Sequence, residues 1–381
     1  MHILIAPNAF KNSLTAQLAA AAIEKGFQKS ALACTTECFP IGDGGDGTGD
    51  LLIERNKGKI ITVAAADPLE RTITATYGLI DNGTTAVIEM ANASGLRLLK
   101  TEELDPLRAT SYGTGQLLMD ALNRGVGKII IAMGGSATVD GGTGILRALG
   151  MRFLDSHGKI LETIAELTAV HSIDLASLDQ RILQCEVTVL CDVDNHLLGD
   201  AGSAAMFGPQ KGAGEAAVIK LEAALSRLAE VVYQQTGKEI AHLPYGGTAG
   251  GAAAGLYALL NASLVNGAES FLSLTGFEAS LASADLVVTG EGSIDEQTLQ
   301  GKGPYAVAHA AKQKGLPVIG LAGRVPSAPN EKLMVYFDRL LSINKDFIDL
   351  ETALASTAKN LEDTSLTVAN ELYLPLRNEG I

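Results

Sequence analysis

The sequence predicts an α/β protein with two domains, and three observations support this prediction. The chain has 381 residues, of which 47% are hydrophobic. It can therefore bury a sizeable core, and it is too long for one ordinary domain. Glycine is abundant, with 42 residues, while aromatic residues make up only 4%. Short apolar runs alternate with segments of helical periodicity, as in proteins whose strands lead into helices through tight turns.

The N-terminal segments alternate between strand and helix. The run "HILIAP" (residues 2–7) ends in proline and predicts a buried parallel strand. Apolar residues then recur at helical spacing, with Ser13 or Thr15 as a possible N-cap. "CTTECFPI" predicts a second strand, which runs into the glycine loop "GDGGDGTGD" (residues 42–50), and "TGDLLIERN" predicts the next helix.

The middle of the chain has a different pattern. Residues 59–95 hold three strand-like runs with little helix between them, and the "NG" that separates two of these runs is a hairpin signal. From "GTGQLLMDALNRG" onward, helix and strand alternate again: we expect a strand at 128–133, a helix around "GILRALG" and a buried strand at 185–194.

The C-terminal segments repeat the style of the N-terminal ones. Residues 284–295, 316–324 and 338–344 are short apolar runs that end in glycine or polar residues, with Ala-rich helical segments between them. We therefore predict one α/β domain built from residues 1–65 and 280–381, and an inserted mixed α/β domain at 66–279.

Charge and composition exclude several classes of protein. The formal net charge is −14 and there is no basic stripe, which argues against a nucleic-acid partner. No apolar run is long enough for a membrane span, and the N-terminus lacks the features of a signal peptide. Four cysteines do not make a disulfide framework in a chain of this length, so we expect a reducing cytoplasm. The six histidines are scattered, which argues against zinc.

Several glycine-rich loops follow a predicted strand or precede a predicted helix. Without Cβ atoms a backbone can approach an anion closely, and amides at a helix N-terminus point outward, so such loops are suited to phosphate. The loops are "GDGGDGTGD", "GGSATVDGGTG" (134–144), "FGPQKGAG" (207–214), "GGTAGGAAAG" (246–255) and "TGEGSIDEQTLQGKG" (289–303).

Carboxylates beside these loops suggest phosphoryl transfer with Mg²⁺, which prefers oxygen ligands. Glu291 and Asp295 are spaced so that both could face one metal ion, and Asp192 ends an apolar run. Lys11 and Lys211 could neutralise phosphate oxygens. Structural explanations remain open: an aspartate at a strand end is often a turn former, and both lysines could be plain solvated charges.

The glycine loop at 42–50 also matches the dinucleotide pattern G-x-G-x-x-G through Gly42, Gly44 and Gly47. The acid expected about 20 residues further on is missing, since the following segment has none until Asp67. A nicotinamide-dependent hydroxy-acid dehydrogenase is therefore an alternative with little support.

In these same stretches the chain resembles the bacterial class I glycerate kinases. The resemblance rests on motifs that occur in order from residue 6 to residue 304: "APNAFKNSLTA", "GDGGDGT", "IEMANASGL", "DPLRATSYGTGQL", "MGGSATVDGG", "CDVDN" with "LLGD", "FGPQKGA", "GTAGGAAAGL" and "VTGEGSIDEQTLQGKGP".

The resemblance implies ATP- and Mg²⁺-dependent phosphorylation of D-glycerate, with 2-phosphoglycerate favoured over the 3-phospho product. It also implies a flavodoxin-like (Rossmann-like) three-layer domain from both chain ends, the inserted α/β domain, and an active site in the cleft between them. Within the matching motifs we assign catalytic roles to Asp192, Asp43 and Lys11, with Asp43 as the rival base to Asp192, and metal binding to Glu291 and Asp295. Phosphate or nucleotide contacts are assigned to Ser13, Gly134, Gly135, Ser136, Lys211, Gly290 and Gly292.

The chain departs from the usual pattern of that family at four positions. The family usually has Asp, Glu, Asn and Arg where this chain has, respectively, Asn8, Asp46, Val139 and Ser293. A non-enzymatic metabolite-binding regulator on the same fold is therefore a further alternative. The sequence leaves open whether the protein is a monomer or a homodimer.

Overall fold

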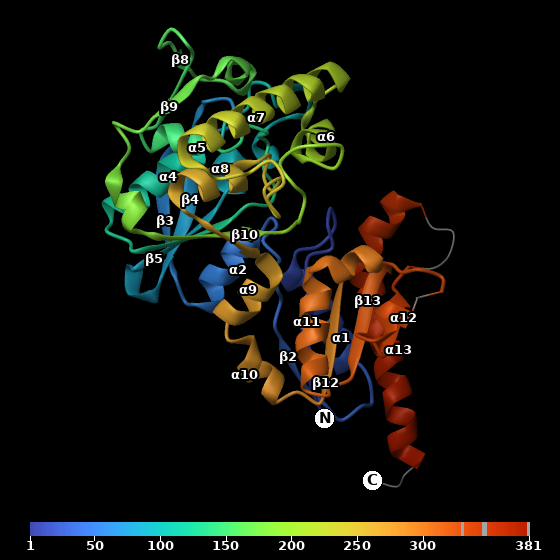
Figure 1. Ribbon diagram of the computed structural model, residues 1–381. Helices are drawn as coiled ribbons and strands as arrows, with labels where there is room; N and C mark the ends of the chain where they lie inside the picture. The colour runs from blue at the N-terminus through green and yellow to red at the C-terminus, as the bar shows by residue number, and fades with distance from the viewer. Residues whose placement is uncertain (329–330, 345–348, 379–381) are drawn as a thin grey trace. The chain divides into compact units, whose positions relative to one another are not determined.

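The computed structural model describes residues 1–328, 331–344 and 349–378. The chain divides into two compact units, which we call the terminal unit (Met1–Asp43 with Ala268–Ile381) and the central unit (Gly44–Gly267). Each unit is built on its own sheet with helices packed on it (Figure 1). The predicted α/β class is confirmed.

The terminal unit contains a five-stranded, fully parallel sheet. Its strand order is β14-β13-β12-β1-β2, so β1 lies in the middle, between β2 and β12. Read in chain order this is the 2-1-3-4-5 arrangement of flavodoxin-type sheets. The strands are β1 (His2–Ile5), β2 (Thr35–Cys38), β12 (Leu286–Ser293), β13 (Val318–Arg324) and β14 (Arg339–Ser342).

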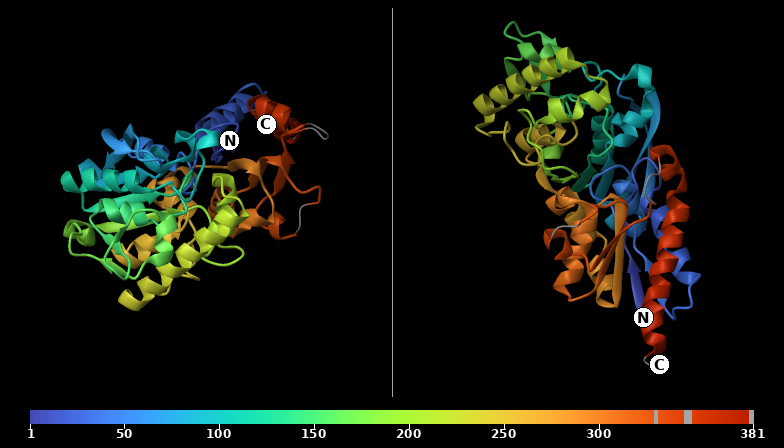
Figure 2. Two further views of the ribbon diagram at one scale, coloured as in Figure 1. Left: turned by 90° about the horizontal axis from the view of Figure 1, so that it is seen from above. Right: turned by 90° about the vertical axis from the view of Figure 1, so that its right-hand side faces the viewer.

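Helices cover both faces of this sheet (Figure 2). On one face, α1 and α13 share an apolar cluster with β1 and β12. Gly26 of α1 lies so close to α13 that a Cβ atom would meet the Glu362 carbonyl oxygen at 2.4 Å. On the other face α11 buries Ala306 and Val307. The helices of this unit are α1 (Ala16–Gln28), α9 (Gly267–Leu274), α10 (Phe277–Ala282), η7 (Glu296–Gln300), α11 (Gly303–Gln313), α12 (Glu331–Met334) and α13 (Leu350–Asn378).

The central unit contains a six-stranded mixed sheet in the order β11-β10-β6-β5-β4-β3. The first four strands run parallel. β4 and β5 form the antiparallel hairpin that the "NG" turn predicted, and β3 pairs antiparallel with β4. The strands are β3 (Lys59–Ala66), β4 (Thr72–Ile80), β5 (Thr85–Glu89), β6 (Lys128–Ala132), β10 (Glu186–Cys191) and β11 (Ser263–Asn266).

The helices of the central unit bury one continuous apolar cluster with this sheet. The α-helices are α2 (Thr48–Arg55), α3 (Ala91–Ser94), α4 (Tyr112–Asn123), α5 (Thr143–Ala148), α6 (Ser203–Phe207), α7 (Glu215–Thr236) and α8 (Ala252–Leu260). The short 3₁₀ turns are η1 (Asp81–Gly83), η2 (Leu96–Leu98), η3 (Thr101–Glu103), η4 (Ile164–Ala169), η5 (Gln180–Gln184) and η6 (Pro209–Lys211).

The central unit also holds a small three-stranded sheet that the sequence patterns did not reveal. Its strands are β7 (Arg152–Leu154), β8 (Ile160–Leu161) and β9 (Ser172–Asp174), in the order β8-β7-β9. Strands of two or three residues are too short to display an alternating pattern, so nothing in this stretch predicted them.

The division into units differs from the predicted domain boundaries. Residues 44–65 were expected with the terminal domain, but β3 pairs along its whole length with β4 of the central sheet. Similarly, residues 268–279 were expected in the inserted domain and belong to the terminal unit, where Phe277 of α10 packs edge-on against Phe39.

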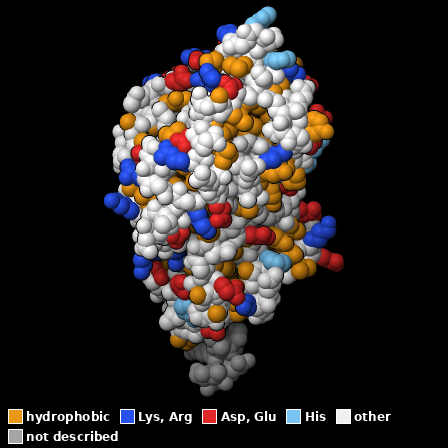
Figure 3. All heavy atoms as spheres, turned by 60° about the vertical axis from the view of Figure 1, so that its left-hand side comes forward, with side chains coloured by type: hydrophobic (Ala, Val, Ile, Leu, Met, Phe, Trp, Pro, Cys, Tyr) orange, Lys and Arg blue, Asp and Glu red, His pale blue; other side chains and the backbone are white. Residues whose placement is uncertain are grey.

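Among the described residues, no helix is long and apolar enough to cross a membrane. The face drawn in Figure 3 carries Lys and Arg side chains interspersed with Asp and Glu, without a continuous basic stripe.

Candidate active site

In the terminal unit, several predicted site residues lie where β1 and β12 end. From β1 the chain crosses to β2 on one side, and from β12 it crosses to β13 on the other side. In doubly wound sheets, ligands bind at the carboxyl ends of two neighbouring strands whose connections diverge in this way. The backbone amide of Asn8 donates to the Gly290 carbonyl at 2.8 Å, so the chain after β1 stays beside β12. The side-chain amide of Asn8 donates to Asp43 Oδ2 at 2.7 Å. Asp43 is thus held at this edge of the sheet.

Glu291 is a buried carboxyl group on β12, with only 8% of the residue exposed. Burial and the nearby charge of Asp43 together raise the pKa of Glu291 to about 8, while Lys302 acts in the opposite direction. The Thr298 hydroxyl donates to Glu291 Oε1 at 3.4 Å. Two acids close together in a buried place attract a cation, and one or two carboxylates are what Mg²⁺ usually takes from a protein.

Asp295 has a local structural role. It is the N-cap of η7: Oδ1 accepts from the Gln297 amide at 2.9 Å, and Oδ2 accepts from the Ser293 hydroxyl at 3.4 Å. A capping carboxylate keeps lone pairs for other contacts, so its predicted part in metal binding stays a prediction. Among the described residues, no group of three or more His, Cys, Asp or Glu side chains is arranged to hold a metal ion.

The loop after β1 contains the other two predicted side chains of this unit. Lys11 is exposed to solvent. The Ser13 hydroxyl donates to the Leu354 carbonyl of α13 at 2.6 Å, and Thr15, not Ser13, caps α1. The Ser13 side chain therefore ties this loop to α13 in the structure.

Gly290 and Gly292 differ in what surrounds them. A Cβ atom at Gly290 would lie 2.1 Å from the Leu321 carbonyl oxygen of β13, so the sheet itself requires glycine there. At Gly292 the nearest atom would be the Lys11 amide nitrogen at 3.8 Å, an ordinary contact distance. Packing therefore explains Gly290 and leaves Gly292 unexplained.

In the central unit, predicted residues follow β6 and β10. The loop after β6 meets the glycine loop that precedes α2: the Gly134 amide donates to the Gly44 carbonyl at 2.9 Å, and a Cβ atom at Gly134 would lie 2.3 Å from Gly45 Cα. Gly135 has a left-handed backbone (φ 70°) and is exposed, and its carbonyl accepts from the Leu96 amide. Two bare backbones are thus packed directly against each other.

Lys211 is buried rather than solvated, with 3% of the residue exposed. Its ammonium donates to Ser136 Oγ at 2.9 Å and to the Thr138 carbonyl at 2.6 Å. Burial lowers the pKa of Lys211 to about 7, while Asp140 and Asp192 act in the opposite direction. The structure therefore brings Ser136 and Lys211 together and places Asp192 within electrostatic reach of them.

Asp192 and Asp140 differ in their surroundings. Asp140 is 2% exposed, and its oxygens accept from the Ser111 amide and hydroxyl and from the amides of Gly142 and Gly144. It acts as a structural anchor. Asp192 directly follows β10 and is half-buried. The next segment is tied down separately, because the Thr248 hydroxyl donates to the Val193 carbonyl at 3.1 Å.

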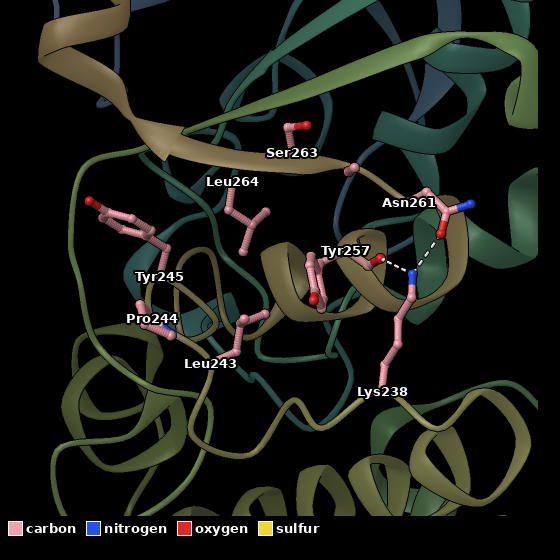
Figure 4. Close-up of a pocket in the computed structure, with 9 residues that line it drawn as sticks. Lys238, Leu243, Pro244, Tyr245, Tyr257, Asn261, Ser263 and Leu264 are labelled. Carbon is pink, nitrogen blue, oxygen red and sulfur yellow. Dashed lines mark hydrogen bonds between the residues drawn. The ribbon is translucent and has the colours of Figure 1, made fainter.

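A cavity of about 480 Å³ elsewhere in the central unit contains none of the predicted residues (Figure 4). Its lining cation, Lys238, already donates to the Tyr257 carbonyl at 3.0 Å and to Asn261 Oδ1 at 2.6 Å. The remaining lining residues include no carboxylate or histidine: Leu243, Pro244, Tyr245, Ala262, Ser263 and Leu264. This cavity therefore supplies neither a base nor a metal ligand for phosphoryl transfer.

Comparison with known proteins decides the family. The profile of the glycerate kinase family matches residues 3–373. The chain belongs to the glycerate kinase family. It is 42% identical to a glycerate kinase of Halalkalibacterium halodurans over 368 residues (96% of this chain, 97% of the relative). It is 39% identical to the glycerate 2-kinase of Escherichia coli K12 over 381 residues, which cover both chains completely. A crystal structure from Salmonella typhimurium LT2, provisionally named glycerate kinase 2, superposes with a TM-score of 0.82 at 41% identity and 99% coverage of each chain.

Membership of the glycerate kinase family makes the protein a phosphotransferase, and a kinase implies ATP. The family resemblance inferred from the ordered motifs is confirmed. Membership of a kinase family also decides against the two alternatives raised from the sequence, the hydroxy-acid dehydrogenase and the non-enzymatic regulator.

The structure shows residues near the site that the sequence patterns did not single out. Thr298 and Lys302 act on Glu291, and Glu89 accepts hydrogen bonds from two backbone amides at the start of α2. Glu89 lies within the apolar run "TAVIEM", which predicts a buried strand and gives no sign of a functional acid.

The structure also shows the surroundings of the four residues that depart from the family pattern. Asn8 is bonded to Asp43, and Asp46 pairs with Arg97 at 2.9 Å. Val139 is fully buried, and Ser293 donates to Asp295.

The open space at Gly292 generates a prediction. Gly292→Ala should leave the thermal midpoint of unfolding nearly unchanged, because the added methyl group makes only ordinary contacts. If a phosphate lies against this bare backbone, the same methyl group should lower kcat/KM for ATP by about tenfold or more, as expected for displacing a charge-assisted hydrogen bond. The measurements are steady-state kinetics and a thermal melt. A variant with normal kinetics for ATP would show that no ligand approaches Gly292.

Proposed function

We propose that the protein transfers the γ-phosphoryl group of ATP to D-glycerate in an Mg²⁺-dependent reaction, and that the product is 2-phosphoglycerate rather than 3-phosphoglycerate. The observation that carries this proposal is the family match along almost the whole chain. The choice of the 2-hydroxyl is supported by the full-length similarity to a relative named glycerate 2-kinase.

The proposed binding of phosphate uses backbone and cation together. Gly134, Gly135, Ser136 and Lys211 form one such set in the central unit, and Gly292 with Lys11 forms another in the terminal unit. The Thr138 hydroxyl beside Lys211 is buried and has no hydrogen-bond partner among the described residues. A buried unpaired hydroxyl is costly, so a ligand or water that accepts its proton would be stabilising there.

The proposed metal ligand is Glu291, with Asp295 as the second candidate. Glu291 fits Mg²⁺ because its carboxyl group is buried beside Asp43, so a bound cation would offset both the burial of a charge and the repulsion between the two acids. Mg²⁺ would neutralise charge on the transferred phosphoryl group. The protein's own residues would position the triphosphate and accept the proton of the substrate hydroxyl.

The first prediction from this proposal tests the substrate. ADP should form when D-glycerate, ATP and Mg²⁺ are all present, and it should fall to background when D-glycerate is omitted or when EDTA removes the metal. A parallel reaction with NAD⁺ in place of ATP should give no NADH. NMR of the phosphorylated product distinguishes the 2-phospho from the 3-phospho ester. ADP formation with another hydroxy acid or a sugar, but not with D-glycerate, would overturn the substrate assignment.

The second prediction concerns the metal. Glu291→Gln keeps the size of the side chain and removes its charge, so the Mg²⁺ concentration at half-maximal rate should rise at least about tenfold, since even losing an outer-shell partner of a metal site costs that much affinity. Glu296→Gln is the matched control, because Glu296 is an exposed glutamate that follows shortly after Glu291, at the start of η7. Equal Mg²⁺ dependence in the two variants would remove Glu291 from the metal site.

The third prediction concerns the catalytic base. We propose that Asp192 accepts the proton of the substrate hydroxyl, so Asp192→Asn should lower kcat by about 10²-fold or more with little change in the thermal midpoint. Asp43→Asn is the comparison, because Asp43 is the rival base. If Asp192→Asn lowers the thermal midpoint while its folded fraction turns over normally, Asp192 is a turn anchor and the role passes to Asp43.

A further inference from the structure

Glu89, the last residue of β5, is a buried acid that contacts a functional loop. Only 2% of the residue is exposed. Its Oε1 accepts from the Gly47 amide at 2.8 Å and its Oε2 accepts from the Gly49 amide at 2.9 Å. Both amides belong to the start of α2, where backbone N–H groups have no helical partner of their own. One carboxylate thus satisfies two orphan donors and closes the glycine loop onto the sheet.

The fit between Glu89 and this loop is close. A Cβ atom at Gly49 would lie 2.9 Å from Glu89 Oε2 and 3.1 Å from Glu89 Cβ. Gly47 has a left-handed backbone (φ 90°), which residues with a side chain rarely adopt, and a Cβ atom there would meet nothing within 4 Å. The approach to Glu89 therefore explains Gly49, while the backbone conformation explains Gly47.

Further charged residues surround the contact between Glu89 and the glycine loop. Asp46 and Asp50 lie close enough to act on it, and burial together with Asp46 raises the pKa of Glu89 above its ordinary value, while the Gly47 amide opposes this. Arg97 pairs with Asp46 Oδ1 at 2.9 Å and donates to Asn92 Oδ1. In this way Asp46, which replaces the family's usual Glu, is tied to the segment after β5.

The glycine loop in turn contacts the loop after β6. Gly134 donates to Gly44, and the closest approach of the two backbones excludes any side chain at Gly134. A contact that holds the glycine loop before α2 in place therefore also holds one side of the Gly134–Ser136 backbone in place.

We infer that Glu89 is a positioning residue for the kinase reaction: it holds the glycine loop 44–49 so that this loop supports the phosphate-binding backbone of Gly134–Ser136. The inference rests on the proposed function for the identity of the ligand at that backbone. Glu89 itself touches no substrate in this scheme. Its effect passes through two amide contacts and one backbone-to-backbone contact.

The test compares Glu89→Gln with Asp120→Asn. A glutamine offers one acceptor oxygen, so at least one of the two glycine amides loses its partner. Asp120 is the matched control, because its carboxylate in the same unit also accepts two hydrogen bonds, from Tyr77 at 2.8 Å and Arg124 at 2.7 Å, but lies on α4 away from the glycine loop.

We expect kcat/KM for ATP to fall about 10- to 100-fold in Glu89→Gln, the range for losing a hydrogen bond to a charged group. KM for D-glycerate should change less than about threefold, since the inference places the effect on the phosphate-binding backbone. Amide hydrogen exchange in the peptide that spans 42–52 should become about tenfold faster or more in this variant. Asp120→Asn should change neither the exchange of that peptide nor the kinetics for ATP.

Gly49→Ala provides a second variant in case Glu89→Gln folds poorly. Its methyl group displaces the Glu89 carboxyl without removing it, while alanine favours the α2 helix. It should reproduce the same change in kinetics and exchange. Unchanged exchange at 42–52, or a loss of activity no larger than the loss of folded protein, would overturn the positioning role. Absence of activity with D-glycerate in the unmodified protein would instead overturn the proposed function. Amide hydrogen exchange of the peptide 42–52 would then still test whether Glu89 holds the glycine loop.

Discussion

The pairing of β1 with β12 is the interaction on which the organisation of the chain depends. Ile3, Leu4 and Ile5 are fully buried and lie in register with Leu286, Val287 and Val288. This pairing closes the terminal unit from two distant parts of the sequence, so the central unit must be an insertion between them. It also places the segment after β1 beside the C-terminal half of β12, which is how Asn8 and Glu291 come to share one edge of the sheet. A change that weakened this pairing would disturb fold and site together.

Much of the fold could be predicted from the sequence because several of its strands, among them β1, β6 and β13, are almost entirely buried. Such strands appear as short continuous apolar runs, and those at 2–7, 128–133, 185–194 and 316–324 each contain a strand of the structure. The unit boundary was harder to place. The run that forms β3 and the runs of the terminal sheet have similar composition, and only the partner strand decides to which sheet a run belongs. Pairing is a tertiary property, and a single strand does not encode it.

The candidate site was predictable in part. Parallel strands place their carboxyl ends at the same edge of a sheet, so acids near the ends of such strands can lie close together. Asp43 and Glu291, both assigned to the site from the motifs, act on each other electrostatically in the terminal unit. The burial of Lys211 was not predictable, because a lysine after a glycine-rich turn has the same local pattern whether it is solvated or enclosed. Its environment depends on Ser136 and Thr138, more than 70 residues earlier in the chain.

The buried charges explain why so many glycines surround them. A buried carboxylate or ammonium is costly unless donors or acceptors replace its water, and side chains that did so would need more room than backbone groups. Backbone amides and carbonyls solve both problems, since they supply hydrogen bonds without adding volume. Glu89 bonds to two glycine amides, and Lys211 bonds to one carbonyl and one small hydroxyl. In the terminal unit, Asn8 gives Asp43 a donor where the family's usual aspartate would give it a second negative charge. Asp43 in turn acts on the buried Glu291, so the neutral Asn8 adds no further negative charge to this pair of acids.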